Sequence, residues 1–338
     1  MLNKEIFSNN TISQRGVWRA TVIVIFTLLA LGGFILSLTK GALSISLQDI
    51  VGAIFYDHAG ATGQVIWNIR LPRTLVGALV GMNLALAGAI LQGVMKNPLA
   101  DPHIIGISSG AGLAGVTIMV LFPHLEYLVT PMAFVGAMTA AIFIYILAWK
   151  GGIRPVRIIL AGVAVSAFLN SGISALMVFY SDRVHGALMW MVGGLSARSW
   201  PHLAIILPYT VVGGILALLG ARRLNILNLG DDIARGLGLN VEFSRLAMTA
   251  VAALLAASAV SVVGLLGFVG LIVPHGARLL VGSDYRYLLP ASAILGMAVV
   301  TISDTLARVA FSPVEIPVGI IMAFVGAPFF LYLLRRDA

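Results

Sequence analysis

The chain has 338 residues, of which 59% are hydrophobic, only 10% are charged and none is cysteine. Soluble globular domains carry about 25% charged residues, so this composition excludes a water-soluble domain and predicts an integral membrane protein. The lack of cysteine excludes a disulfide framework and a thiolate metal site. The net charge of +8 does not indicate nucleic-acid binding, because the basic residues lie in short segments between apolar runs.

Ten apolar segments predict membrane-spanning helices, since about 20 apolar residues cross the hydrocarbon core. We therefore expect an all-α, polytopic membrane protein with one transmembrane domain over residues 20–338, preceded by a cytoplasmic tail of residues 1–19. The third and eighth spans are expected to be short or broken. The predicted spans are Ala20–Leu38, Leu75–Val94, Ile104–Leu121, Val129–Ala148, Ile158–Val178, Leu203–Leu219, Leu246–Leu265, Leu266–Val281, Leu288–Val309 and Pro317–Leu334.

The distribution of Lys and Arg predicts the orientation of these spans, because cytoplasmic loops carry an excess of basic residues. Ten spans with a cytoplasmic N-terminus place fifteen of the 21 basic residues inside and six outside. The six outer ones are Lys40, Arg70, Arg73, Arg183, Arg198 and Arg308. Both termini are therefore predicted to be cytoplasmic.

Two short catalytic patterns occur, and both are weak. "GISSG", which contains Ser108, fits the nucleophile elbow, but that motif requires a strand-to-helix turn over a sheet. An intramembrane serine protease with Ser108 as nucleophile and His275 as base remains an alternative. "GAGLAG" matches G-x-G-x-x-G without the βαβ context that gives this pattern meaning. The Walker pattern is absent, so ATP-driven transport would need a separate ATPase chain.

His275 follows Pro274 near the end of the eighth span, and Arg278 follows three residues later. A single histidine without clustered ligands is weak evidence for a metal. We therefore expect helix capping or packing at a helix end, with Arg278 extending to the lipid headgroups.

The inner segment Arg222–Arg245 is too polar to cross a membrane, yet it is punctuated by leucines and isoleucines. Asp231 and Asp232 are typical of a first helical turn, and Gly238 can end that helix. Long loops in compact bundles are usually functional. We expect a short helix that docks on a motor subunit.

At the outer side, Asp304 and Arg308 lie four residues apart on one helical face and can pair. Arg70 and Arg73 have no acidic neighbour in sequence. They are either interfacial anchors or a docking site for acidic side chains of an external partner. "KNPLADP" links the second and third spans with residues that break a helix, and a broken helix at membrane depth usually lines a cavity.

Together these segments resemble the FecCD-type permease family, the type II ABC importers for ferric siderophores, haem and cobalamin. The resemblance runs from about residue 38 to residue 336. The matching segments are "RLPR", "GAILQGVMKNPLADPHIIGISSGAG", "ILAGVAVSA", "WMVGGL", "LGDDIARGLGL", "GFVGLIVPHGARLLVGSDYRYLLPAS", "DTLARV", "EIPVGI" and "GAPFF".

The resemblance implies a cobalamin-permease-like fold and the permease subunit of an importer in the bacterial cytoplasmic membrane. Its implied partners are a second permease, identical or paralogous, two cytoplasmic ATP-binding subunits and an external substrate-binding protein. ATP and Mg²⁺ would be used by the ATPase, with no cofactor or metal bound by this chain. A ferric siderophore is the favoured cargo, with haem, cobalamin and an oxyanion left open.

The resemblance also implies roles for individual residues. Residues 222–245 would form the coupling helices, with Asp231, Asp232, Ile233, Ala234, Leu237 and Gly238 in contact with the ATPase. Asn97 and Leu99 would lie at the cytoplasmic gate, and Arg70, Arg73 and Arg308 would receive acidic residues of the binding protein. The remaining family positions would be structural: Pro98, Pro274, His275, Arg278, Asp304, Glu315 and Pro317.

Overall fold

The computed structural model describes residues 2–41, 44–56, 60–103, 106–150 and 155–337, and within these ranges the chain forms helices and loops without strands. The elements are α1 (Leu2–Thr39), α2 (Leu47–Phe55), α3 (Ala61–Val65), the π-helical turn η1 (Ile66–Arg70), α4 (Leu71–Met95), α5 (Ile107–Leu121), the 3₁₀ turn η2 (Pro123–Leu128), α6 (Val129–Ala148), α7 (Pro155–Phe179), the 3₁₀ turn η3 (Ser181–Arg183), α8 (Val184–Val192), α9 (Trp200–Asn228), α10 (Asp231–Gly236), α11 (Val241–Val263), α12 (Val269–Val281), α13 (Tyr285–Val309) and α14 (Val318–Asp337).

The described helices fit a multi-pass membrane protein. Seven are long and apolar enough to cross a bilayer, and three shorter apolar helices lie at Ile107–Leu121, Val269–Val281 and Val318–Leu331. The first two of these are α5 and α12, so the prediction that the third and eighth spans are short is confirmed. Residues 2–19, which were expected to form a tail, are instead the first part of α1. The predicted span start at Ile104 and the basic residue Arg154 lie outside the described residues.

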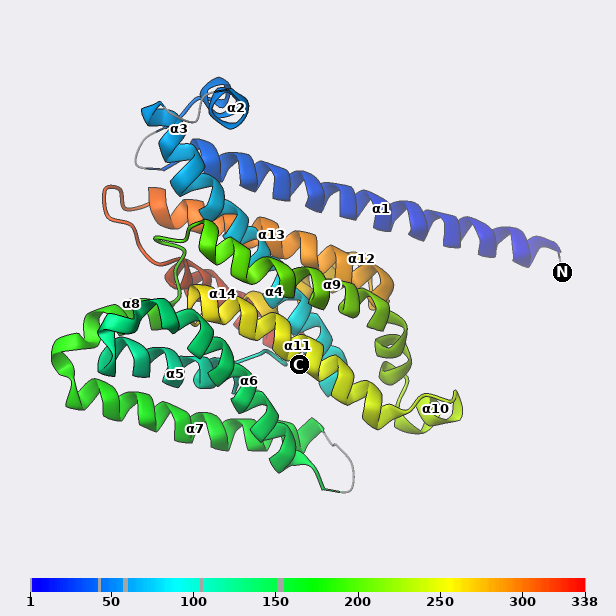
Figure 1. Cartoon of the computed structure of the whole chain (residues 1–338). Helices are drawn as coiled ribbons and strands as arrows, with labels where there is room; N and C mark the ends of the chain where they lie inside the picture. Colours follow the sequence, from blue (N-terminus) through cyan, green and yellow to red (C-terminus); the bar gives the residue numbers. More distant parts are fainter. Residues whose placement is uncertain (1, 42–43, 57–59, 104–105, 151–154, 338) are drawn as a thin grey trace.

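Helix α4 is the centre of the fold and is buried along most of its length. It packs against α9, α11, α12 and α13, while α1 lies along α13. Helices α5, α6 and α7 form a second group, joined to the centre through α11 (Figure 1). The short helices α2, α3 and α8 lie at one end of the bundle and α10 lies at the opposite end (Figure 1). We call these the outer end and the inner end, after the predicted topology.

Glycines allow the central helices to approach closely. A Cβ on Gly81 of α4 would lie 2.1 Å from the carbonyl oxygen of Gly296 on α13. A Cβ on Gly88 would lie 1.9 Å from the carbonyl oxygen of Gly270 on α12. Membrane helices rely on such contacts, because lipid is as apolar as leucine and supplies no hydrophobic drive for helix association. The high glycine content therefore has a packing role at the core of this bundle.

Pro274 and His275 do not cap a helix end as expected, because α12 continues past them to Val281, the predicted end of the eighth span. Proline has no N–H with which to bond the carbonyl four residues earlier, here that of Gly270. The side chain of Gln92 on α4 donates to that carbonyl instead, with Nε2 at 3.3 Å. Neighbouring groups of this kind allow proline inside membrane helices, and sequence periodicity does not reveal them.

We predict that Gly81→Ala destabilises the protein by about 1–3 kcal/mol, the usual cost of overpacking a filled core. The matched control is Gly32→Ala on α1, where nothing lies within 4 Å of the added carbon. Thermal unfolding in detergent, followed by loss of the monodisperse peak in size-exclusion chromatography, measures both variants. Equal midpoints for the two variants would contradict the close approach of α4 and α13.

Candidate functional site

A buried ionic cluster lies at the outer end, centred on Asp304 of α13. The carboxylate of Asp304 accepts from Arg73 of α4, with Nη2–Oδ1 and Nε–Oδ2 both at 3.0 Å. It also pairs with Arg308, whose Nε lies 3.2 Å from Oδ2. The predicted pair of Asp304 and Arg308 is therefore confirmed. One carboxylate binds two buried guanidinium groups and so joins α4 to α13.

Arg73 has a further partner, Glu315, in the segment between α13 and α14. Its Nη1 lies 2.8 Å from Oε2 of Glu315, whose side chain is 41% exposed compared with 3% for Asp304. The sequence places no acidic residue near Arg73, but the fold brings two to it from more than 200 residues away. Glu315 is thus the solvent-facing member of the cluster.

Arg70 and Arg308 extend the cluster to the end of α1. Arg70 donates from Nη1 to the carbonyl oxygens of Leu38 at 2.7 Å and Thr39 at 3.1 Å. Arg308 donates from Nη2 to the hydroxyl of Ser37 at 2.8 Å. Basic side chains near a helix C-terminus can satisfy its last carbonyl groups. The two arginines therefore anchor α1 against the rest of the outer end.

The three arginines expected to dock an external partner are thus brought together, but each is buried, with 5–7% of its surface exposed. Among the described residues, the three guanidinium groups and two carboxylates of the cluster give it one net positive charge. A buried charge is screened less by salt than an exposed one. The cluster can therefore act on an approaching carboxylate through its field, and the docking role of these arginines stays a prediction.

At the inner end, the predicted coupling segment contains one separate helix, α10. Residues 222–228 complete α9 and residues 241–245 begin α11. Asp231 and Asp232 lie in the first turn of α10, as expected. Gly238, with φ of +80°, follows the end of the helix. Ala234 is fully buried, whereas Ile233 and Leu237 are 56% and 60% exposed. The helix therefore displays two apolar side chains to solvent.

Asp231 fixes α10 to two neighbouring elements. Its Oδ1 lies 2.8 Å from Nζ of Lys96, at the end of α4, and 2.7 Å from Nη2 of Arg245 on α11. Burial raises the pKa of Asp231, but the hydrogen bonds from Lys96 and Arg245 outweigh this effect and hold the pKa below its usual value. The sequence does not indicate the role of Lys96, which is 135 residues from its partner.

A second set of hydrogen bonds at the inner end joins α9 to α13. Asn225 donates to Oδ1 of Asp284 at 2.7 Å and accepts from the backbone N–H of Tyr285 at 2.9 Å. Hydrogen bonds from Arg286, and then from Asn225, lower the pKa of Asp284 to about 2. The inner ends of α4, α9, α11 and α13 are thus connected around α10.

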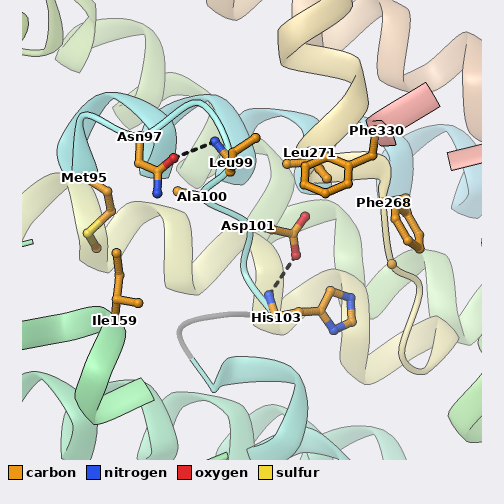
Figure 2. A pocket seen from close by; sticks show the side chains of 11 residues that line it. Met95, Asn97, Leu99, Ala100, Asp101, His103, Ile159, Phe268, Leu271 and Phe330 are labelled. Carbon is orange, nitrogen blue, oxygen red and sulfur yellow. Dashed lines mark hydrogen bonds between the residues drawn. The ribbon is translucent and has the colours of Figure 1, made fainter. Parts of the chain in front are cut away.

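Residues 96–103, which follow α4, form turns beside a cavity of about 560 Å³ (Figure 2). Oδ1 of Asn97 accepts from the backbone N–H of Leu99 at 2.9 Å, and Oδ1 of Asp101 accepts from that of His103 at 2.9 Å. Phe268, before α12, and Phe330, on α14, face the same space (Figure 2). The gate role of Asn97 and Leu99 stays a prediction, and the structure joins the two residues by a hydrogen bond within one turn.

The remaining family positions lie in tertiary contacts. Pro98 lines a polar cavity beside Lys96 and Arg278. Arg278 does not reach the headgroups as expected: its Nη2 donates to Oε1 of Gln92 at 2.8 Å. His275 is buried within α12. Gln92, which sequence reasoning missed, thus bonds both to Arg278 and to the carbonyl freed by Pro274.

Pro317 directly precedes α14, at the point where that helix meets the turn after α8. The backbone N–H of Gly319 donates to the carbonyl of Gly193 at 3.0 Å. Ser108 lies buried in the first turn of α5, and its hydroxyl has no hydrogen-bond partner among the described residues. A base that activates a serine must lie within hydrogen-bond reach of it.

Comparison with known proteins agrees with this architecture. The model of the FecCD transport family matches residues 28–336. The chain is 38% identical over 323 residues, 96% of it and 97% of the relative, to the Fe(3+)-citrate import system permease protein YfmD of Bacillus subtilis (strain 168). It is 38% identical over 326 residues, 94% of each chain, to the hemin transport system permease protein HmuU of Yersinia pestis.

Two further comparisons extend this relationship. The chain is 46% identical over 276 residues, 81% of it and 74% of the relative, to the cobalamin import system permease protein BtuC of Halobacterium salinarum. A solved structure assigned to the metal-chelate type of ABC transporter, in an inward-facing conformation, matches with a TM-score of 0.83 at 28% identity. That match covers 94% of this chain and 99% of the other.

The fold and the comparisons define the class first: the chain is a transmembrane permease subunit of an ATP-binding-cassette importer and is not itself an enzyme. The chain belongs to the FecCD transport family. This assignment sets aside the serine-protease alternative built on Ser108, which also lacks a bonded base in the described part of the chain.

We predict that Asp304→Asn destabilises the protein by about 3–5 kcal/mol, because it leaves Arg73 and Arg308 as buried charges without their shared carboxylate. Glu315→Gln is the matched control and should cost less than about 1 kcal/mol, since its side chain is partly exposed. Thermal unfolding in detergent measures both. If Asp304→Asn unfolds no earlier than Glu315→Gln, then Asp304 does not hold the cluster together.

Proposed function

We propose that this permease imports a metal chelate across a bacterial cytoplasmic membrane. It would act with a second permease subunit, identical or paralogous, two ATP-binding subunits and an external substrate-binding protein. The relatives carry names for Fe(3+)-citrate, hemin and cobalamin import. An iron–siderophore type of chelate is the cargo we favour, with haem or cobalamin as the alternative within the same family.

The single observation that carries the coupling mechanism is the exposed apolar pair on α10. Ile233, within α10, and Leu237, directly after its last residue, lie four residues apart. Both are exposed, whereas Ala234 is buried. Helix-in-groove recognition uses apolar anchors at this spacing. We assign this face to the ATPase, which would bind ATP and Mg²⁺. Asp231, anchored by Lys96 and Arg245, would transmit motion of α10 to α4 and α11.

The opposite end suits the substrate-binding protein. The outer cluster keeps one net positive charge around Asp304, and Arg70 and Arg308 converge beside Gly41, where a Cβ would lie 3.0 Å and 3.7 Å from their terminal nitrogens. Potentials of opposite sign steer partners together. Acidic side chains on the binding protein would complete this surface. Delivery at one end and ATP hydrolysis at the other require a path through the bundle.

Leu237→Asp should prevent coupling to the ATPase. A charge in the helix-in-groove contact must lose water without gaining a partner, which weakens docking by about 2–4 kcal/mol. Leu237→Met is the matched control, because it retains apolar volume. ATPase co-purification and ATP-driven uptake in vesicles are the readouts. Retention of both by Leu237→Asp would place the ATPase contact elsewhere.

The proposed orientation has its own test, which the absence of native cysteine makes clean. A cysteine at Gly236, exposed on α10, should resist an impermeant thiol reagent added to intact cells. A cysteine at Ser196, exposed at the outer end, should react with it. Both sites should react after the cells are opened. The reverse pattern in intact cells would invert the topology.

A further inference from the structure

A cavity of about 650 Å³ opens at the outer end. Its lining is more polar than that of the cavity beside Asn97 and Leu99. The outer-end cavity lies between η2, α8, the turn before α9 and the segment that leads into α14. Its apolar wall includes Trp190 and Met189, and its hydroxyl groups include Tyr127 and Thr130. Ligand pockets commonly measure roughly 300–1,000 Å³ and combine apolar walls with a few polar groups. The cavity has the size and lining of a small-molecule site.

Arg198, which lines this cavity and is partly buried, differs from the buried arginines. Arg73, Arg245 and Arg308 each pair with an aspartate. None of the ion pairs among the described residues includes Arg198. Its Nε is buried and has no hydrogen-bond partner within those ranges. Burial lowers the pKa of the Arg198 guanidinium, which the charge of Glu126 only partly offsets. The cavity therefore contains a cation without a bonded counter-ion.

His202 on the first turn of α9 orients this cation. Its Nε2 lies 3.2 Å from Nη1 of Arg198, and its Nδ1 lies 3.1 Å from the hydroxyl of Ser199. Nε2 faces the guanidinium donor, and Nδ1 faces the backbone N–H of Ser199 at 3.3 Å. A ring nitrogen that accepts a hydrogen bond carries no proton. The imidazole is then neutral and adds no charge. Arg198 is positioned from one side, while its Nε stays unsatisfied.

The acids that line the cavity do not supply the missing counter-ion. Glu315 is bound to Arg73, and Glu126 is exposed to solvent, where its charge is screened. Because Glu315 belongs both to the cavity lining and to the outer cluster, the cavity adjoins the proposed docking surface of the binding protein. A chelate released there would meet Arg198 early on its path.

We propose that Arg198 forms an entry subsite that binds a carboxylate of an anionic metal chelate. A carboxylate can accept charge-assisted hydrogen bonds from the guanidinium. The proposal rests on the proposed import function and narrows its substrate class to chelates with free carboxylates. Trp190 and Met189 would contact the apolar part of the chelate.

The test uses vesicles that contain the permease with its ATPase and binding protein. Uptake of ferric citrate, an anionic probe, is compared with uptake of ferrichrome, a neutral trihydroxamate probe. Arg198→Gln should raise the KM for ferric citrate at least about tenfold, since one charge-assisted hydrogen bond is lost, and change any ferrichrome uptake less than twofold. Arg198→Lys should restore part of the loss. Arg183→Gln, at an exposed arginine of the same end, is the matched control.

The possible outcomes are distinct. If the wild-type complex imports neither probe nor any other metal chelate, the proposed function fails and the subsite fails with it. If the wild type imports only neutral chelates, the function stands and the subsite is overturned. If ferric citrate is imported and Arg198→Gln leaves its KM unchanged, or impairs both probes equally, the subsite is also overturned. A selective rise in the KM for ferric citrate supports it.

Discussion

The outer end of this bundle depends on the carboxylate of Asp304. Arg73 and Arg308 are buried at the same place, and burying one charge without a partner costs several kcal/mol. Asp304 bonds both guanidinium groups and so allows α4 and α13 to meet there. Arg308 and Arg70 in turn bond the end of α1, and Arg73 reaches Glu315 ahead of α14. Helices α1, α4 and α13 and the segment before α14 are thus fixed relative to one another by a network that retains one positive charge.

Ion pairs between basic and acidic side chains occur at both ends of the molecule, but their structural roles differ. At the outer end the arginines are buried and bonded to Asp304 and Glu315. At the inner end Asp231 is bonded by Lys96 and Arg245, so that the ionic groups anchor α10 and its exposed face is apolar. The excess positive charge proposed for this cluster would favour a transient, steered encounter with a soluble protein. An apolar helix face suits a longer-lived contact with a motor subunit.

Local patterns in the sequence predicted the features that depend on near neighbours. The pair of Asp304 and Arg308, the first-turn acids of α10, the glycine after it and the short helices α5 and α12 all follow from spacing or composition. Contacts between distant segments could not be predicted. Arg73 meets Asp304 across 231 positions, and Gln92 satisfies the carbonyl that Pro274 leaves free in α12. The helix cap expected at His275 was wrong for this reason.

The most direct test of this account is the affinity of the substrate-binding protein for the reconstituted complex as salt is raised. Arg73→Glu would place a third acid beside Asp304 and Glu315. Glu315→Gln is therefore the cleaner change, because it only raises the net charge of the cluster from one to two. The Debye length, over which salt screens a charge, shortens from about 10 Å at 0.1 M to about 3 Å at 1 M salt. We predict that wild-type affinity falls with salt, and that Glu315→Gln associates faster at low salt with a steeper salt dependence. Affinity that is independent of both salt and Glu315 would contradict docking on this cluster.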